Sequence, residues 1–379
     1  MKKISRESWK VTDNDLLKFA VFLMCVSEML QTSVIFSSWT IVIDGLKYMV
    51  PIIGVFIVFL RRHTSTHFTY ILKCILVSSI IIITCFFTKD FSYFLVCIIL
   101  VLSRYLKIDD FIRISFRVLI IFSILNIFLW VLNLIVNLGY PIYYNEAERR
   151  ISFLFIHPNF AALKLGWGVV MYVWLKWNDL KNRNLIICFL AVIILYITTK
   201  ADSCIIILFF LFMVVLRNVE RIKNVTILFS KYCFFILGIF SLGIAKMYEN
   251  AGKLTSIVRS LDLLFSRRFA MSYLAIKDNG LSIIGQTVNM KHSWDSLFNF
   301  EDYMIDSLYI YLYVCIGIVY FILIGIAFMK LAKYRNYKIS IVIIAFSLFA
   351  MIEVHCLYLS NCFVLLLLKY VIFKEDKVE

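Results

Sequence analysis

The sequence predicts an all-α polytopic membrane protein that forms a single integral membrane domain over residues 1–379. Hydrophobic residues make up 62% of the chain and charged residues only 17%, whereas soluble domains contain about half apolar and about a quarter charged residues. Apolar runs of roughly 20 residues, the length that crosses a bilayer as a helix, recur along the chain. These two observations exclude a soluble enzyme, a secreted disulfide scaffold, a coiled coil and a disordered chain.

The apolar runs predict about 12 transmembrane helices, with a range of roughly 10–13. We expect them at about 16–36, 39–60, 68–87, 91–106, 111–138, 160–177, 184–199, 202–216, 226–247, 304–328, 338–358 and 360–373. The first run is too long for the apolar core of a signal peptide and contains Lys18 and Glu28. We therefore expect it to be retained as the first span.

Basic residues in the short loops set the orientation, because cytoplasmic loops carry an excess of Lys and Arg. With both termini in the cytoplasm, the following basic residues all fall on the inner side: Lys2, Lys3, Arg6, Lys10, Arg61, Arg62, Arg104, Lys107, Arg113, Lys176, Lys181, Arg183, Arg217, Arg221, Lys223, Lys330, Lys333, Arg335, Lys338, Lys374 and Lys377. The net charge of +15 therefore follows from membrane topology. Outside these loops the sequence has no basic stripe of the kind that would indicate nucleic-acid binding.

The ten cysteines lie in or at the edges of apolar runs, and no CxxC pair occurs. This pattern indicates neither a disulfide framework nor a zinc site. We expect the cysteines to behave as small hydrophobic residues.

Two segments on the predicted outer side break the charge pattern. The first is the loop at 139–159, which carries the pair Arg149 and Arg150. Because arginines are usually sorted to the inside, we interpret this pair as having a binding partner outside; the alternative is that an outer loop tolerates any charge. The second is the large outer loop at 248–304, which is long enough for a small folded element.

The large outer loop has a basic half followed by an acidic half. Between Lys253 and Lys277 the sequence is basic, and from Asp278 to Asp306 it is acidic. In the basic half, apolar residues fall on one face of a helix: Leu261, Leu264, Phe265, Phe269, Tyr273 and Ile276. This periodicity predicts an amphipathic helix in the outer interface, with its cations at the depth of lipid phosphates. It serves either to bind substrate or simply to connect two spans.

The end of the first outer loop, RRISFLFIHPN, is the segment most suggestive of a binding site. Pro158 fits the first turn of the following helix, which places His157 near its N-cap. A helix N-terminus favours an anion, and the planar guanidinium of arginine binds phosphate oxygens in pairs. These features predict a pocket for an anionic group; the alternative is that HPN is only a helix cap.

This segment resembles the R-x-S/T-x-G-F-x-H-P-N motif of the Wzy-type bacterial repeat-unit polymerases. These enzymes belong to the O-antigen ligase-like superfamily and build O-antigen and capsular polysaccharide. Residues 198–203 (TTKADS) resemble the T-x-S-R turn of that family, with Lys200 in place of arginine. Residues 266–285 resemble the arginine-then-glycine segment of the family's large outer loop. Residues 306–317 resemble the opening of the family's next span, with Ser307 in place of asparagine. Glu353 matches an acid that the family carries in a late span. The first motif also lacks its glycine, because Phe153 and Leu154 precede FIHPN.

The resemblance implies a glycosyltransferase on the outer face of the bacterial cytoplasmic membrane. The donor would be a growing glycan on undecaprenyl pyrophosphate, and the acceptor the non-reducing end of one lipid-linked repeat. Membrane lipids, and the flippase and chain-length regulator of the same pathway, are the expected partners.

Such a reaction needs cations for the departing pyrophosphate and a base for the attacking hydroxyl. The expected catalytic residues are Arg150, His157, Arg267, Asp306 and Glu353, and the expected substrate-binding residues are Arg149, Asn159, Lys200 and Arg268. Among these, His157, Asp306 and Glu353 are the candidate bases; alternatively, Glu353 and His355 form a buried pair that locks helices together. No cluster has metal-ligand spacing and the donor carries its own leaving group, so we expect a metal-independent reaction without a cofactor.

Three other functions remain open at the level of sequence. An O-antigen ligase usually carries a histidine just before the span that follows the large loop, where this chain has Asp306, with His292 fourteen residues earlier. A transporter or flippase of lipid-linked oligosaccharide should show repeated halves and charges along its spans. In a membrane scaffold without enzymatic activity, Arg149 and His157 would be replaceable.

Overall fold

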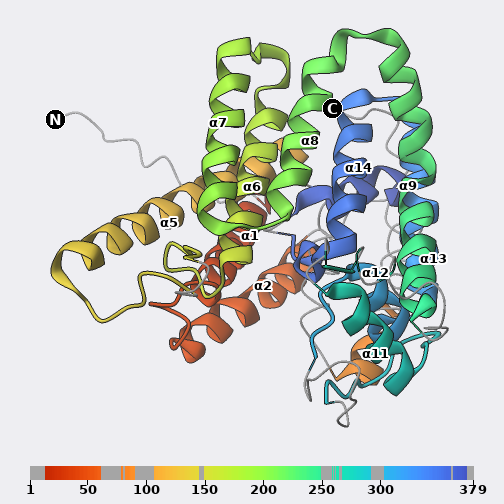
Figure 1. The fold of residues 1–379 in the computed structure, drawn as a ribbon, viewed down its shortest axis with the longest axis horizontal. Helices are drawn as coiled ribbons and strands as arrows, with labels where there is room; N and C mark the ends of the chain where they lie inside the picture. Colours follow the sequence, from red (N-terminus) through yellow and green to blue (C-terminus); the bar gives the residue numbers. More distant parts are fainter. Residues whose placement is uncertain are drawn as a thin grey trace, which may run out of the picture.

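The computed structural model describes residues 13–60, 78–79, 82–89, 106–144, 149–248, 258, 260, 262–263, 267–291, 303–359 and 362–373. Within these ranges the chain is helical and no named strand occurs (Figure 1). Two residues, Ser33 and Phe155, form an isolated antiparallel bridge. The predicted all-α class is therefore confirmed over the described part of the chain.

The larger part of the molecule is an upright bundle of helices (Figure 1). Its members are α6 (Pro158–Leu175), α7 (Asn182–Thr199), α8 (Ser203–Val215), α9 (Glu220–Met247), α13 (Ile318–Leu331) and α14 (Tyr337–Ile352). Helix α14 packs against both α8 and α9, and nearly all of its residues are buried. A helix that is apolar on every side and surrounded by other helices forms the centre of the bundle.

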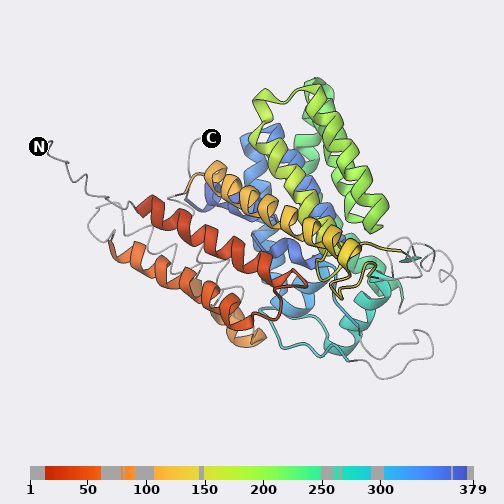
Figure 2. The ribbon, with the colours of Figure 1, turned by 90° about the vertical axis from the view of Figure 1, so that its left-hand side faces the viewer.

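The N-terminal helices form a second group, tilted with respect to the bundle (Figure 2). It consists of α1 (Asp13–Gln31), α2 (Thr40–Leu60) and α5 (Ile108–Val136). Helix α1 packs against α2 and α5, and α5 in turn packs against α6. The contact between α5 and α6 therefore joins the tilted group to the bundle.

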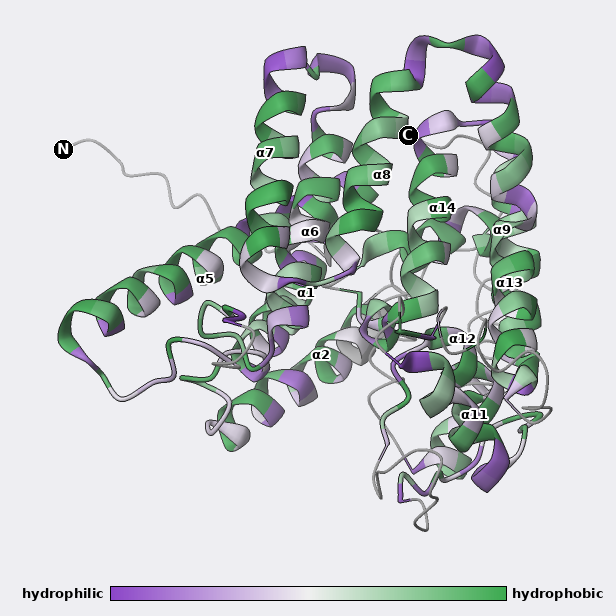
Figure 3. Cartoon of the chain, in the orientation of Figure 1, coloured by the Kyte–Doolittle hydropathy of each residue, from purple (hydrophilic) through white to green (hydrophobic). Residues whose placement is uncertain are grey.

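Apolar side chains cover the outside of several helices as well as their inner faces (Figure 3). Ile121 of α5 and Ile239 of α9 are each 64% exposed. Helices α5, α7 and α9 are long and apolar enough to cross a membrane, and shorter apolar helices lie at 203–218, 337–352 and 363–373. Exposed apolar surface of this extent is favourable only against lipid, so the chain is membrane-embedded.

Most predicted spans that fall on described residues coincide with helices to within a few residues, whereas 91–106 and most of 68–87 lie outside the described residues. The span predicted at 304–328 is interrupted. It comprises α12 (Leu308–Tyr311), the π-helical turn η4 (Leu312–Ile316) and α13. Between η4 and α13, Gly317 has a φ of 119° and lies against the backbone of Ile283, where a Cβ atom would collide.

Two further predicted spans differ from the continuous helices expected. At 338–358, α14 ends at Ile352, Glu353 is extended and a short turn η6 (Val354–Leu357) follows. At 360–373 the chain forms the 3₁₀ segment η7 (Phe363–Leu368) and α15 (Lys369–Phe373). In both segments the sequence is continuously hydrophobic. Hydrophobicity does not reveal where the backbone leaves the helical conformation, so these breaks could not be predicted.

The loops of the bundle divide between its two ends. The connections α6–α7, α8–α9 and α13–α14 lie at the upper end in Figure 1, where the short turns η2 (Trp177–Asp179), η3 (Leu216–Asn218) and η5 (Ala332–Tyr334) occur. The turn between α7 and α8, together with helix α11 (Arg268–Asn279), lies at the opposite end. The upper end carries the basic loops that we expect inside.

We predict that a cysteine placed at Arg149 is modified in intact cells by a membrane-impermeant maleimide, whereas one placed at Lys333 is protected. Both side chains are exposed and lie in loops at opposite ends of the bundle. The natural cysteines of the described residues are buried, so unmodified protein gives the background. Labelling at position 333 combined with protection at position 149 would reverse the orientation.

Candidate functional site

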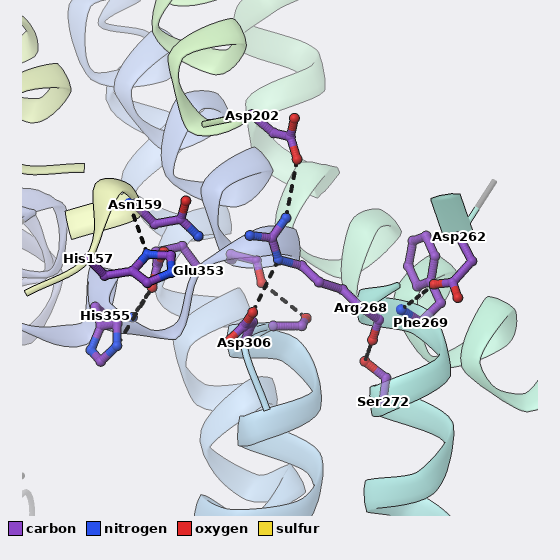
Figure 4. A network of polar contacts seen from close by, with 12 residues as sticks. His157, Asn159, Asp202, Asp262, Arg268, Phe269, Ser272, Asp306, Glu353 and His355 are labelled. Carbon is purple, nitrogen blue, oxygen red and sulfur yellow. Dashed lines mark hydrogen bonds and ion pairs between the residues drawn. The ribbon is translucent and has the colours of Figure 1, made fainter. Parts of the chain in front are cut away.

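Polar side chains from five separate segments meet at the lower end of the bundle (Figure 4). They come from the loop and first turn of α6, the α7–α8 turn, the start of α11, the residue two before α12, and the junction of α14 with η6. Together these segments contribute Arg150, His157, Asn159, Asp202, Arg268, Asp306, Glu353 and His355, which we call the polar cluster.

The first turn of α6 positions His157 and Asn159. His157 is the N-cap residue and Pro158 is the first helical residue, as the sequence predicted. The Nδ1 atom of His157 accepts a hydrogen bond from the backbone N–H of Asn159 at 3.1 Å, and its ring makes an edge contact with Tyr144 at a centroid distance of 4.5 Å. With Nδ1 used as an acceptor, Nε2 carries the proton of the neutral ring and is a donor.

The loop before α6 is held in an unusual backbone conformation. Phe153 and Leu154 have positive φ angles of 51° and 60°, a region that favours glycine. Leu154 occupies the position where the resembling motif has glycine, and its side chain is buried. The loop is tied to the end of α1, because Val34 N–H donates to the Leu154 carbonyl and Ile156 N–H donates to the Thr32 carbonyl.

Arg150 links this loop to the α7–α8 turn. Its Nε donates to the carbonyl oxygen of Thr199 at 2.9 Å, and one terminal nitrogen donates to Oδ1 of Asn159 at 2.8 Å. The backbone N–H of Ile151 also donates to the Thr198 carbonyl. The guanidinium is therefore fixed between two helix ends rather than extended into solvent.

Arg268 occupies the middle of the cluster, between two carboxylates. A terminal nitrogen lies 3.4 Å from Asp202, and Nε lies 3.4 Å from Asp306. The side chain of Arg268 is only 9% exposed, whereas those of Asp202 and Asp306 are about one third exposed. Arg268 thus joins the α7–α8 turn, the large outer loop and the segment before α12.

The start of α11 is fixed by a cap that holds Arg268 in place. The buried carboxylate of Asp262 accepts hydrogen bonds from the backbone N–H groups of Phe269 at 2.8 Å and Ala270 at 3.2 Å. Such a cap satisfies donors that a helix N-terminus leaves unpaired.

Helix α11 forms within the predicted amphipathic segment, but its buried side includes Leu274 and Ala275 in addition to Phe269. It packs against α9 and α12. Part of the predicted apolar face (Leu261, Leu264 and Phe265) lies outside the described residues. Over its described length, α11 therefore buries side chains against protein.

Glu353 lies where α14 ends and is almost entirely buried. One of its carboxylate oxygens lies 3.9 Å from Nε2 of His355 and accepts the His355 backbone N–H at 3.3 Å. Asp306 and Arg268 are close enough to act on its charge. The extended backbone at Glu353 thus turns an acid out of an apolar helix and into the cluster.

Burial and the arginines control two ionisation states in the cluster. Burial, reinforced by the positive charges of Arg150 and Arg268, lowers the pKa of His157 from its usual 6.5 to about 4. Burial raises the pKa of Asp306, and the adjacent Arg268 opposes part of that shift. At neutral pH His157 is therefore uncharged and a weak base.

The structure brings together six of the nine predicted site residues and leaves three outside. Arg149, Lys200 and Arg267 are exposed and all have positive φ angles near 50–60°. Arg267 precedes α11 as its N-cap residue, and the chain reversal there directs the next residue, Arg268, into the cluster. The expected catalytic residue Arg267 therefore lies outside the cluster, and the expected substrate-binding residue Arg268 lies within it.

Sequence reasoning missed Asp202, the carboxylate that pairs with Arg268. The residue lies inside the TTKADS segment that carries a resemblance, so the signal was present but Lys200 was chosen. Asp262 is the one acid between Lys253 and Lys277. A single acid before a helix that follows a basic stretch was a usable sign of a cap.

Comparison with known proteins adds no family assignment, because no protein-family model, curated protein or solved structure matches the chain. Among the described residues, no group of three or more His, Cys, Asp and Glu side chains is placed to hold a metal ion. The argument for function therefore rests on the residues of the polar cluster.

The lowered pKa of His157 predicts a pH effect on stability. Between about pH 6.5 and pH 4 the unfolded chain binds a proton at this residue and the folded chain does not, so folded stability decreases as pH falls through that window and does not change above it. His157→Asn keeps a capping side chain but cannot titrate. In purified protein, the melting temperature of the variant should decrease less between pH 7 and pH 4.5 than that of the wild type, whereas parallel curves would show that the ring is not held neutral.

Proposed function

We propose that the chain polymerises lipid-linked oligosaccharide repeat units, transferring the growing glycan from undecaprenyl pyrophosphate to the next repeat. One observation carries the proposal: the segments that resemble the Wzy-type polymerases, although up to two hundred residues apart, contribute Arg150, Arg268, Asp306 and Glu353 to one cluster. Two arginines beside two carboxylates match the needs of a reaction that releases a diphosphate and activates a hydroxyl.

The departing diphosphate would be bound by Arg150 and Arg268. Its charge increases as the bond to the sugar breaks, and cations already fixed in position stabilise that charge without reorganising. Arg150 is held by Thr199 and Asn159, and Arg268 is held by two carboxylates. A diphosphate arriving beside Arg268 would compete with Asp202 or Asp306 for the same guanidinium, which would leave a carboxylate available for another partner.

A carboxylate is better suited than His157 to be the base. The acceptor hydroxyl would transfer its proton to Asp306 or Glu353 while its oxygen forms a bond to the anomeric carbon of the donor. The bond between that carbon and the diphosphate oxygen breaks, and the electron pair leaves with the diphosphate. Because Nδ1 of His157 accepts a backbone hydrogen bond and the pKa of the ring is near 4, this residue would act as a donor from Nε2.

The cellular setting follows from the same proposal. The protein would be a multi-pass protein of the bacterial cytoplasmic membrane with both termini inside and the polar cluster at the outer face. Its substrate is itself a membrane lipid, so it would reach the cluster laterally. The flippase that supplies the repeat units and a chain-length regulator are the expected partners.

We predict that deletion of the chain removes long surface glycans and causes single lipid-linked repeats to accumulate on the outer face. The measurement is glycan chain-length analysis together with accessibility of the repeats in intact cells. Repeats trapped on the inner face would instead identify a flippase. Long chains that stay on undecaprenyl pyrophosphate would identify a ligase, and unchanged glycan would refute all three functions.

We further predict that Arg150→Ala and Arg268→Ala each reduce polymerisation by about 10²-fold or more, the usual effect of removing one preorganised charge donor. Arg267→Ala is the matched control, because it removes the same charge from the exposed neighbouring residue. Glycan length and membrane protein level are measured together. Loss of polymer in the Arg267 variant with normal polymer in the Arg268 variant would restore the assignment made from sequence.

A further inference from the structure

A second polar site lies beside the cluster, between the tilted helices and the bundle. It is a pocket lined by Glu28, Gln31, Thr32, Ile156, Phe160, Lys164, His355 and Tyr358. The lining comes from α1, from the loop and first two turns of α6, and from the segment around η6. Every side chain of the polar cluster except His355 lies outside it.

Lys164 is the feature of this pocket that most needs a partner. It lies in the middle of α6 and is 1% exposed, and its Nζ has no hydrogen-bond partner in the described chain. Oε2 of Glu28 is likewise buried without a hydrogen bond. Glu28 is close enough to act on the charge of Lys164, but this does not provide the directed hydrogen bonds that a buried ammonium and carboxylate require.

The remaining walls combine aromatic faces with hydrogen-bonding groups. The ring of His355 lies 4.5 Å from that of Phe160 and 5.8 Å from that of Tyr358, measured between centroids. Gln31 is oriented by Lys47, whose Nζ donates to its amide oxygen at 2.9 Å. The pocket thus offers one cation, one carboxylate, an amide and aromatic surfaces.

We infer that this pocket binds a hydroxyl-bearing sugar ring of the acceptor repeat unit, with Lys164 donating to a ring oxygen or hydroxyl and Glu28 accepting from a neighbouring hydroxyl. A sugar hydroxyl is both donor and acceptor, so one ring satisfies both orphaned groups. A free anion could accept a hydrogen bond from Lys164 but has no hydroxyl to donate to Glu28. The inference rests on the proposed function, because it identifies this pocket as the acceptor site of the proposed polymerisation.

The position of the pocket relative to the base supports this assignment. His355 lines the pocket, and its Nε2 lies 3.9 Å from Glu353 in the polar cluster. Ile156 and Phe160, which also line it, flank His157 and Asn159 in sequence. A sugar bound against Phe160 and Tyr358 would therefore lie next to the carboxylates that receive the hydroxyl proton, and the diphosphate would lie at the arginines beyond them.

The test uses full-length protein in lipid nanodiscs and the free oligosaccharide released by mild acid from lipid-linked repeats of the deletion strain. Binding is measured by calorimetry. We expect Lys164→Met to weaken binding by about tenfold or more, the effect of losing one charge-assisted hydrogen bond from a buried site. Lys246→Met, a matched change on exposed surface of α9, should leave binding unchanged.

A kinetic measurement separates a sugar site from a purely structural ion pair. With the released oligosaccharide as acceptor, Lys164→Met and Glu28→Gln should raise KM by about tenfold and change kcat less. A structural pair would lower the amount of folded protein and leave KM unchanged. If Lys164→Met fails to fold, Glu28→Gln and Tyr358→Leu, which removes an aromatic face of the pocket, provide the test, with a several-fold rise in KM expected for each.

Failure of this inference is distinguishable from failure of the proposed function. If the deletion strain stops polymerising but the Lys164 and Glu28 variants bind and use the oligosaccharide as well as wild type does, the pocket is not the acceptor site and the polymerase proposal stands. The same conclusion follows if wild-type protein does not bind the oligosaccharide. If the deletion strain polymerises normally, the proposed function is wrong and the acceptor assignment falls with it.

Discussion

The ion pairs of Arg268 with Asp202 and Asp306 are the interaction on which the rest of the site depends. A guanidinium that is 9% exposed is tolerable only when its charge is compensated, and here two chain segments provide the compensation. Removal of either carboxylate would leave charge buried with too few partners, which usually costs several kcal/mol. The same pairs add to the packing of α11 on α12, so the electrostatics that stabilise this end of the bundle also position the polar cluster.

Sequence reasoning predicted the helical class, most helix boundaries, and the cap formed by His157 and Pro158, because these follow from local hydrophobicity and backbone preferences. It could not predict features that depend on long-range geometry. Arg267 and Arg268 are adjacent and identical in the sequence, which therefore does not show which of them enters the polar cluster. In the structure the left-handed backbone at Arg267 leaves this side chain exposed, and Arg268 is buried. Lys164 is a different case: an ionisable residue within an apolar span is a warning by itself, and it was overlooked because the loops held the stronger motifs.

Irregular backbone interrupts several apolar segments of the described chain. Helix α14 ends at Ile352 and is followed by the extended residue Glu353. The span after the large loop breaks at Gly317, and η6 and η7 replace regular helix near residue 373. Within a bilayer, non-helical backbone is tolerated only where protein or a water-filled cavity covers it. The interruption after Ile352, which hydrophobicity could not reveal, is the one that turns Glu353 and His355 toward the polar cluster.

The loop through Leu154 has a mechanical consequence. The loop is coupled to α1, because the carbonyl of Leu154 and the N–H of Ile156 are both hydrogen-bonded to residues that directly follow that helix. Any change in the inclination of α1 is then transmitted directly to Arg150 and His157, which lie on either side of the loop. Since helices tilt to match hydrocarbon thickness, the lipid composition of the membrane would act on the geometry of these two residues without contacting either of them.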